Sequence, residues 1–185
     1  MSALKVVHLS VVHRPDDARI YERECRTLAA AGYDVTYLVP GATPGRDRHG
    51  VRFAALPVRP RARRWMSTPD IVAALRTLRP FVVHTHDPEL LPLYPFLRPF
   101  VPRLVHDAHE FLREQVMAKE YVPARVRPLV ATASSLGQRG LTHWADGIVT
   151  VTDDVLNDFG PHLRQSLIAP NYPRLSHFAG AAPFA

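Results

Sequence analysis

The chain has a single cysteine, Cys25, which excludes an internal disulfide framework and a zinc site built from cysteines. It has no run of about 18 apolar residues, so the sequence predicts no membrane-spanning helix. The apolar segment after Lys5 is too short for a secretory signal. We therefore expect a cytoplasmic protein.

Glycine-rich phosphate loops are also missing. The stretch from Ser10 to Asp17, which follows the first apolar segment, contains no glycine. Neither the G-x-G-x-x-G fingerprint of dinucleotide-binding domains nor the P-loop spacing occurs, and there is no G-x-S-x-G elbow. A nicotinamide-dependent enzyme, a P-loop ATPase and a hydrolase with that elbow are therefore not expected.

Lysine is scarce, since the basic residues are 21 arginines and only two lysines, and the net charge is +6. The arginine excess has two interpretations. It reflects either genomic base composition or affinity for phosphate, which the forked guanidinium group binds with two hydrogen bonds. A nucleic-acid partner is not expected, because no recognition helix or aromatic stacking motif accompanies the charge.

The 185 residues, 46% of them hydrophobic and 22% charged, suit one globular domain with a full core. Short β-branched segments alternate with helical patterns. Strands are expected at 5–9, 34–39, 51–56, 81–84, 104–107, 147–151 and 167–169, and helices at 18–31, 68–78, 89–97, 125–144 and 153–159. This order predicts an α/β fold, a Rossmann-like three-layer α/β/α domain with a mostly parallel sheet of about seven strands.

Polar residues concentrate where three of these strands end. His13 and Arg14 follow the first strand, the segment 84–89 follows the fourth, and the segment 106–110 follows the fifth. Because ligands of such sheets bind beyond the carboxyl ends of the strands, these residues predict a binding site along one edge.

The histidines of this edge have different expected roles. His84 and His106 still lie within strands and are expected to be core residues, whereas His86 and His109 either contact a ligand or pack against loops. His84 and His86 share one strand face, a spacing that metallohydrolases use. Those enzymes follow with Asp-His where this chain has Pro88 and Glu89, so we expect no metal.

Several motifs together resemble the N-terminal half of a GT-B fold glycosyltransferase of family 4. They are DARI at 17–20, LAAAGYDV at 28–35, HDPELLP at 86–92, DAHE at 107–110, ADGIVTVT at 145–152 and NYP at 171–173. The resemblance implies two Rossmann-like domains facing a cleft, the N-terminal one for the acceptor and the C-terminal one for the nucleotide-sugar donor. It also implies that the reaction retains the anomeric configuration and needs no metal or other cofactor.

The resemblance also implies roles for individual residues. His109 matches the family's histidine that contacts the transferred sugar, so it is the expected catalytic residue. His13 and His86 are expected along the same edge. Arg14 or Arg19 is expected to contact the donor phosphates, because the first loop lacks glycine. A further set is expected to hold acceptor hydroxyls, namely Asp87, Glu89 and Glu110, although Asp87 and Glu89 have an alternative role as caps of the next helix.

The expected domain is residues 1–175, with 176–185 as the start of a linker to a C-terminal donor-binding domain that this sequence does not contain. The chain is then expected to be inactive alone and to need that missing domain as its partner, with a glycan, a lipid-linked molecule or a small molecule as acceptor. The alternative is a stand-alone Rossmann-like module that binds a sugar or nucleotide, or a subunit of a split transferase.

The basic stretch from Arg59 to Trp65 leaves two interpretations open. Four arginines beside a tryptophan suit an anionic membrane surface, at about 1 kcal/mol for each basic residue. The other interpretation is a solvated loop. The first would place the protein peripherally at the inner face of the membrane.

Overall fold

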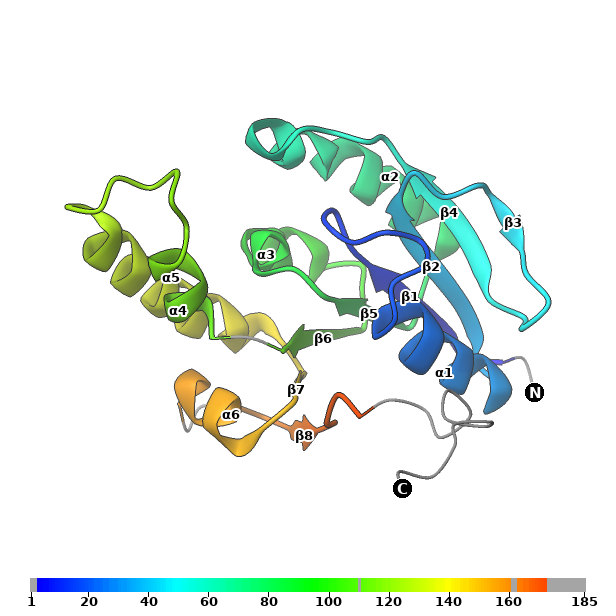
Figure 1. Ribbon diagram of the computed structural model, residues 1–185. Coiled ribbons are helices and arrows are strands. Elements are labelled where there is room, and N and C mark those ends of the chain that lie inside the picture. Colours follow the sequence, from blue (N-terminus) through cyan, green and yellow to red (C-terminus); the bar gives the residue numbers. More distant parts are fainter. Residues whose placement is uncertain (1–2, 110, 161–162, 173–185) are drawn as a thin grey trace, which may run out of the picture.

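Seven parallel strands and one short antiparallel strand form the sheet of the computed structural model, which describes residues 3–109, 111–160 and 163–172 (Figure 1). The strand order is β3-β4-β2-β1-β5-β6-β7-β8. The strands are β1 Lys5–Leu9, β2 Asp34–Pro40, β3 Gly45–Arg46, β4 Arg52–Leu56, β5 Val82–Thr85, β6 Arg103–Ala108, β7 Gly147–Thr150 and β8 Ser166–Ile168. The predicted α/β fold with about seven parallel strands is confirmed.

The strand order reverses at β1, which lies between β2 and β5 and is parallel to both. Only β3 is antiparallel to its neighbour, β4. This strand of two residues was not predicted, because it is too short to show an alternating pattern. The reversal at β1 creates the point at which ligands of doubly wound sheets bind.

Helical segments connect most of the strands. They are η1 Ile20–Cys25, α1 Arg26–Ala30, η2 Arg61–Ser67, α2 Thr68–Leu78, η3 Pro88–Leu93, α3 Tyr94–Leu97, α4 Leu112–Met117, α5 Arg127–Leu141, η4 Thr142–Trp144 and α6 Asp153–Phe159. The sequence predicted neither α4 nor η2.

Local contacts cap two of these helices. The Asp17 carboxylate accepts hydrogen bonds from the amides of Arg19 and Ile20, at 2.9 and 2.8 Å. Gly32 follows α1 with φ of +91°, a conformation that suits glycine. The Thr152 hydroxyl accepts a hydrogen bond from the Val155 amide at 3.3 Å, and α6 begins there.

The first helix departs from the predicted regular α-helix. Over Ile20–Cys25 it widens into a π-helical turn, in which the Glu24 amide bonds to the Arg19 carbonyl, five residues back. In a regular α-helix, two residues five apart would lie about 140° apart around the axis. The wider turn instead brings Arg19 Nε within 3.2 Å of Glu24 Oε1. Such turns are frequent at functional sites.

The two faces of the sheet carry different packing. On one face, Val7 and Leu9 of β1 join a large core with residues of α2, α3 and α6. On the other, Ile20 and Cys25 of η1 pack on β2 in a smaller core. Figure 1 shows α2 and α3 on one side of the sheet and α1 on the other. His8 lies on the face of the first helix, since it pairs in register with Tyr37 of the smaller core.

Among the described residues, no helix combines the length and the apolar character needed to cross a membrane.

Candidate functional site

A pocket of about 450 Å³ lies at the carboxyl ends of β1, β5 and β6. Several residues predicted for the site line it, and so do basic residues of η2 and of the segment after α4. The lining includes His13, His86, Asp87, Glu89, Asp107, His109, Arg61, Arg64 and Lys119. The expected gathering of His13, His86 and His109 along one edge is therefore present.

Asp87 fixes the loop that follows β1. Its Oδ2 accepts hydrogen bonds from the Val11 amide at 2.6 Å and from the Ser10 hydroxyl at 3.0 Å. The Ser10 hydroxyl in turn accepts a bond from the His13 amide at 2.8 Å. The Asp87 side chain makes no capping bond to η3, so the capping alternative is wrong for this residue. Burial raises the pKa of the Asp87 carboxyl.

His13 lies between two carboxylates at the mouth of the pocket. Its Nδ1 is 2.9 Å from Asp17 Oδ2, and its Nε2 is 3.5 Å from Asp87 Oδ1. The hydrogen bond to Asp17 raises the pKa of His13, although partial burial opposes this. The rings of His13 and His109 meet edge to face with centroids 5.7 Å apart. The pocket therefore holds an imidazole that favours the positive form beside the predicted catalytic histidine.

Asp107, near the end of β6, is the charge centre of the site. Arg19 donates to it through Nε and Nη2, both at 2.7 Å, and Arg19 Nη1 donates to the Ala169 carbonyl at 3.2 Å. His86 Nδ1 lies 3.2 Å and His109 Nδ1 lies 3.6 Å from Asp107 Oδ2. Burial alone would raise the pKa of Asp107, but these partners hold it well below its usual range.

The arginines predicted to contact phosphate have different environments. Arg19 is only 8% exposed and its guanidinium is occupied by Asp107 and Ala169, which favours a positioning role. The Arg14 side chain is 83% exposed and pairs with Asp16 at 3.1 Å. Glu89 lies at the pocket and faces Arg64 at 3.4 Å. Glu110 and the proposed linker 176–185 lie outside the described residues.

The basic segment faces the pocket instead of forming a separate charged strip. Arg59 pairs with Asp70 at 2.7 Å, Arg64 pairs with Glu89, and the Arg61 guanidinium lies 4.5 Å from the ring centroid of Tyr121. Trp65 is 73% exposed. Three of these arginines thus have partners within the chain, and two of them line the site.

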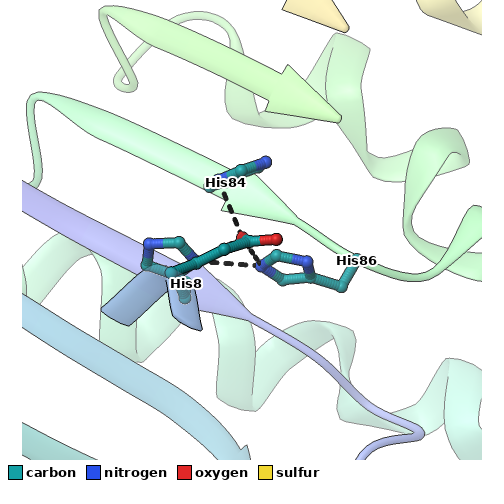
Figure 2. Close-up of side chains that lie close together, drawn as sticks. His8, His84 and His86 are labelled. Carbon is teal, nitrogen blue, oxygen red and sulfur yellow. Dashed lines mark hydrogen bonds and ion pairs between the residues drawn. The ribbon is translucent and has the colours of Figure 1, made fainter. Parts of the chain in front are cut away.

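A second polar cluster lies beside the pocket, on the face of the first helix. His8 of β1, His84 of β5 and His86 converge there (Figure 2), and Glu24 of η1 completes the group. His84 and His106 were both predicted to be core residues with satisfied hydrogen bonds. His106 is buried and bonds to the Thr85 hydroxyl. His84 is buried too, but its Nε2 has no hydrogen-bond partner in the described part of the chain. Burial lowers the pKa of both His84 and His86 to about 3, so both are neutral at pH 7.

Sequence reasoning missed Asp107, Glu24 and His8 as site residues. Asp107 is part of the DAHE motif at 107–110, but nothing in the sequence indicated that Arg19 is its partner. His8 reads as a core position of a buried strand, and its proximity to His84 follows only from the register of β1 and β5. Glu24 reaches the sheet only because of the π-helical turn.

The fold is that of the Rossmann-like domains of GT-B glycosyltransferases. The chain matches the glycosyl transferase 4-like domain over residues 18–165, and it belongs to that family. A comparison with curated proteins finds no match.

Solved structures of low sequence identity share the fold. Sucrose-phosphate synthase from Thermosynechococcus elongatus superposes with a TM-score of 0.66 at 19% identity, over 95% of this chain and 52% of that one. UGT73P12 from Glycyrrhiza uralensis, complexed with glycyrrhetinic acid 3-O-monoglucuronide, gives a TM-score of 0.59 at 10% identity, over 89% of this chain and 48% of that one. The chain thus spans about half the length of each of these two proteins.

The Arg19–Asp107 pair gives a test of stability. Arg19→Met removes the guanidinium but keeps a long side chain, so Asp107 stays buried without its main cation. We expect the free energy of unfolding, measured by urea denaturation, to fall by about 3 kcal/mol. The matched variant Arg14→Met removes an exposed pair and should change it by less than about 0.5 kcal/mol. Equal losses in both variants would contradict the central role of the Arg19 pair.

The His13–Asp17 pair gives a test of pH dependence. The pKa of His13 is raised above its ordinary 6.5, so its contribution to stability is full below that pH and is lost as the pH rises through the folded value. The pKa of Asp17 is lowered from 3.8 to about 2, because bonds from His13 and two backbone amides outweigh burial. The contribution of Asp17 is therefore full above its ordinary value and is lost as the pH falls through about 2.

The stability deficit of His13→Gln should therefore be largest between about pH 4 and pH 6.5 and shrink at higher pH. Urea denaturation of wild type and variant across this range measures it. A double-mutant cycle with Asp17→Asn isolates the pair. A deficit that grows from pH 6 to pH 9 would show that His13 is not stabilised as the cation.

Proposed function

We propose that this chain is the acceptor-side domain of a retaining glycosyltransferase that transfers a sugar from a nucleotide-sugar donor. The observation that supports this most is the pocket at the strand reversal, where His13, Asp107 and His109 meet. In this proposal residues 1–175 are the acceptor-side domain, 176–185 begin a linker, and a C-terminal domain supplies most donor contacts. The match to about half of sucrose-phosphate synthase fits this division.

The chemistry requires stabilisation of two opposite charges. As the bond from the anomeric carbon to the diphosphate breaks, the leaving phosphate becomes more negative and the sugar ring becomes positive. Oriented dipoles and charges that are already in place lower the energy of such a transition state. His109 orients the sugar, and the positive form of His13 beside it stabilises the growing negative charge.

Asp107 positions His109 and does not itself contact the sugar in this proposal. Its carboxylate lies 3.6 Å from His109 Nδ1, so it favours the orientation of the ring in which Nε2 points away from the carboxylate. Arg19 keeps Asp107 ionised and in place. We assign Arg19 and His86 positioning roles through Asp107, because both contact its carboxylate.

The basic residues of the pocket lining suggest the acceptor. Arg61, Arg64 and Lys119 form this basic wall, and Glu89 partly balances Arg64. Cationic side chains suit an acceptor that carries a phosphate or carboxylate, while Asp87 lies too deep, at 2% exposure, to hold its hydroxyls freely. We therefore propose an anionic sugar or lipid-linked acceptor, with Glu89 as the hydroxyl acceptor at this wall. In this proposal the reaction takes place in the cytoplasm, at the inner face of the membrane if the acceptor is lipid-linked.

The test of this function uses the complete product of the gene and a panel of nucleotide sugars, with release of nucleoside diphosphate as the readout. His109→Ala should lower turnover about 100-fold and leave the circular dichroism spectrum unchanged. His143→Ala, at an exposed site of η4 away from the pocket, is the matched control and should keep full turnover. Unchanged turnover in His109→Ala would remove this histidine from the reaction.

The 185-residue chain alone should show no turnover in the same assay, since the donor-binding half is missing. Turnover by the chain alone would refute the division into two domains, and binding of nucleotide sugar without turnover by the complete product would favour a stand-alone binding module.

The membrane contact proposed for residues 59–65 has a separate test. Sedimentation with vesicles should retain more of the chain when they contain anionic lipid, and Trp65→Ala with Arg63→Ala should reduce the retained fraction. Equal retention by neutral vesicles argues against an electrostatic contact.

A further inference from the structure

Four polar side chains gather on the face of the first helix, and only His86 among them has a positioning role in the proposed reaction. They are His8, Glu24, His84 and His86. His8, His84 and His86 are at most 9% exposed. Within the described residues, His8 Nε2, His84 Nε2 and both Glu24 oxygens are buried without a hydrogen-bond partner. Of these atoms, Glu24 Oε2 is the one that faces the three imidazoles, since His8 and His84 turn Nδ1 and not Nε2 toward it. A buried carboxylate oxygen without a hydrogen bond is costly, so Glu24 Oε2 lacks a partner at this point.

The geometry of the cluster converges on one point. Three imidazole nitrogens surround Glu24 Oε2, with His8 Nδ1 at 3.6 Å, His84 Nδ1 at 3.7 Å and His86 Nε2 at 3.8 Å. Of the contacts between histidines, His8 Nδ1 to His86 Nε2 is 2.9 Å. One ligand atom from each of the four side chains lies within 4.8 Å of all the others. Figure 2 shows the three rings pointing toward one another from neighbouring strands.

These separations suit the ligand atoms of a four-coordinate metal. A tetrahedral zinc ion with ligand bonds of about 2.0–2.1 Å has neighbouring ligand atoms about 3.3 Å apart. The four distances of 2.9 to 3.8 Å lie on both sides of that value. The three contacts to Glu24 are too long for hydrogen bonds, so the carboxylate gains little from the imidazoles directly.

We infer that His8, Glu24, His84 and His86 form a binding site for one divalent cation of the zinc type. Three imidazoles and one carboxylate are a donor set that zinc accepts in four-coordinate sites. Calcium and magnesium prefer oxygen ligands throughout, so they do not match this set.

A partner outside the cluster supports the assignment. His86 directs Nδ1 at Asp107 Oδ2, 3.2 Å away, and Asp107 is held as a carboxylate by Arg19. The proton of His86 therefore lies on Nδ1, and Nε2 presents a lone pair to the cluster. A metal-binding histidine usually donates its other ring N–H to a carboxylate in this way.

The cluster also has an entrance. His8, Glu24 and His84 line a pocket of about 300 Å³ on this face, together with Arg23, Thr27 and Ala169. His8, Glu24 and His84 do not line the pocket at the carboxyl edge. Of the four proposed ligands, only His86 lines that pocket. The cation therefore lies outside the proposed transfer reaction, and the expectation that the reaction needs no metal is independent of it.

The role of the cation is to join three segments. It would connect β1, β5 and η1 at their closest approach and hold His86, which in turn contacts Asp107. The charge is also favourable, because Arg19 is shared between the carboxylates of Asp107 and Glu24, and a cation at the cluster would balance the second carboxylate.

The experiment uses the 185-residue chain purified without a histidine tag. After dialysis against a chelator, titration with zinc chloride by calorimetry should show one ion bound per chain, and zinc should raise the melting temperature. Cobalt in place of zinc should give the visible absorption of a four-coordinate ion. His84→Gln and Glu24→Gln should each weaken zinc affinity about 100-fold or more, since a ligand contributes more than an outer partner.

His106→Gln is the matched control, because it changes a buried histidine of β6 that lies on the opposite face and bonds to Thr85. It should keep stoichiometric zinc. Circular dichroism of the metal-free variants checks that each is folded, and at least one of the two ligand variants must pass this check. Failure of the wild-type chain to bind zinc, or equal affinity in His84→Gln and wild type, overturns the site. Neither result bears on glycosyl transfer, which the nucleotide-sugar assay tests alone.

Discussion

The site depends on one buried carboxylate, that of Asp107 at the end of β6. A charge in that position is tolerated only with close partners, and Arg19 supplies two short hydrogen bonds from the first helix. His86 and His109 lie against the same carboxylate from two different loops. One charge thus links the helix after β1, the end of β5 and the segment after β6, and the positions of the pocket residues follow from that link.

Much of the fold could be predicted, because most strands contain or follow β-branched residues and each main helix has a cap or an apolar stripe. The parallel order then placed the ends of β1, β5 and β6 together, which is why His13 and His109 were expected near one another and are. The small strand β3 and the short helix α4 carry no comparable pattern. Whether His13, Glu89 or Glu110 contacts substrate stays a prediction.

The partners of charged side chains could not be predicted in the same way. Arg19 was expected to reach a phosphate, yet it lies 88 positions before the carboxylate that it binds. Asp87 was expected to cap a helix or hold a hydroxyl. It makes no capping bond and fixes the loop of Ser10 and Val11, while its contact with a hydroxyl stays a prediction. Such pairings depend on strand register and on the path of loops, which composition and periodicity do not encode.

The widened turn at Ile20–Cys25 constrains how this helix can vary. Regular α-helical hydrogen bonding over these same residues would improve local helix geometry, but it would place Glu24 and Arg19 about 140° apart around the axis. One of the two would then leave the sheet, and either Asp107 would lose its cation or the histidines would lose their carboxylate. Helix regularity and the charge pattern of this face are therefore incompatible, so a version of the chain optimised for helical stability alone would lose the arrangement around β1 and β5.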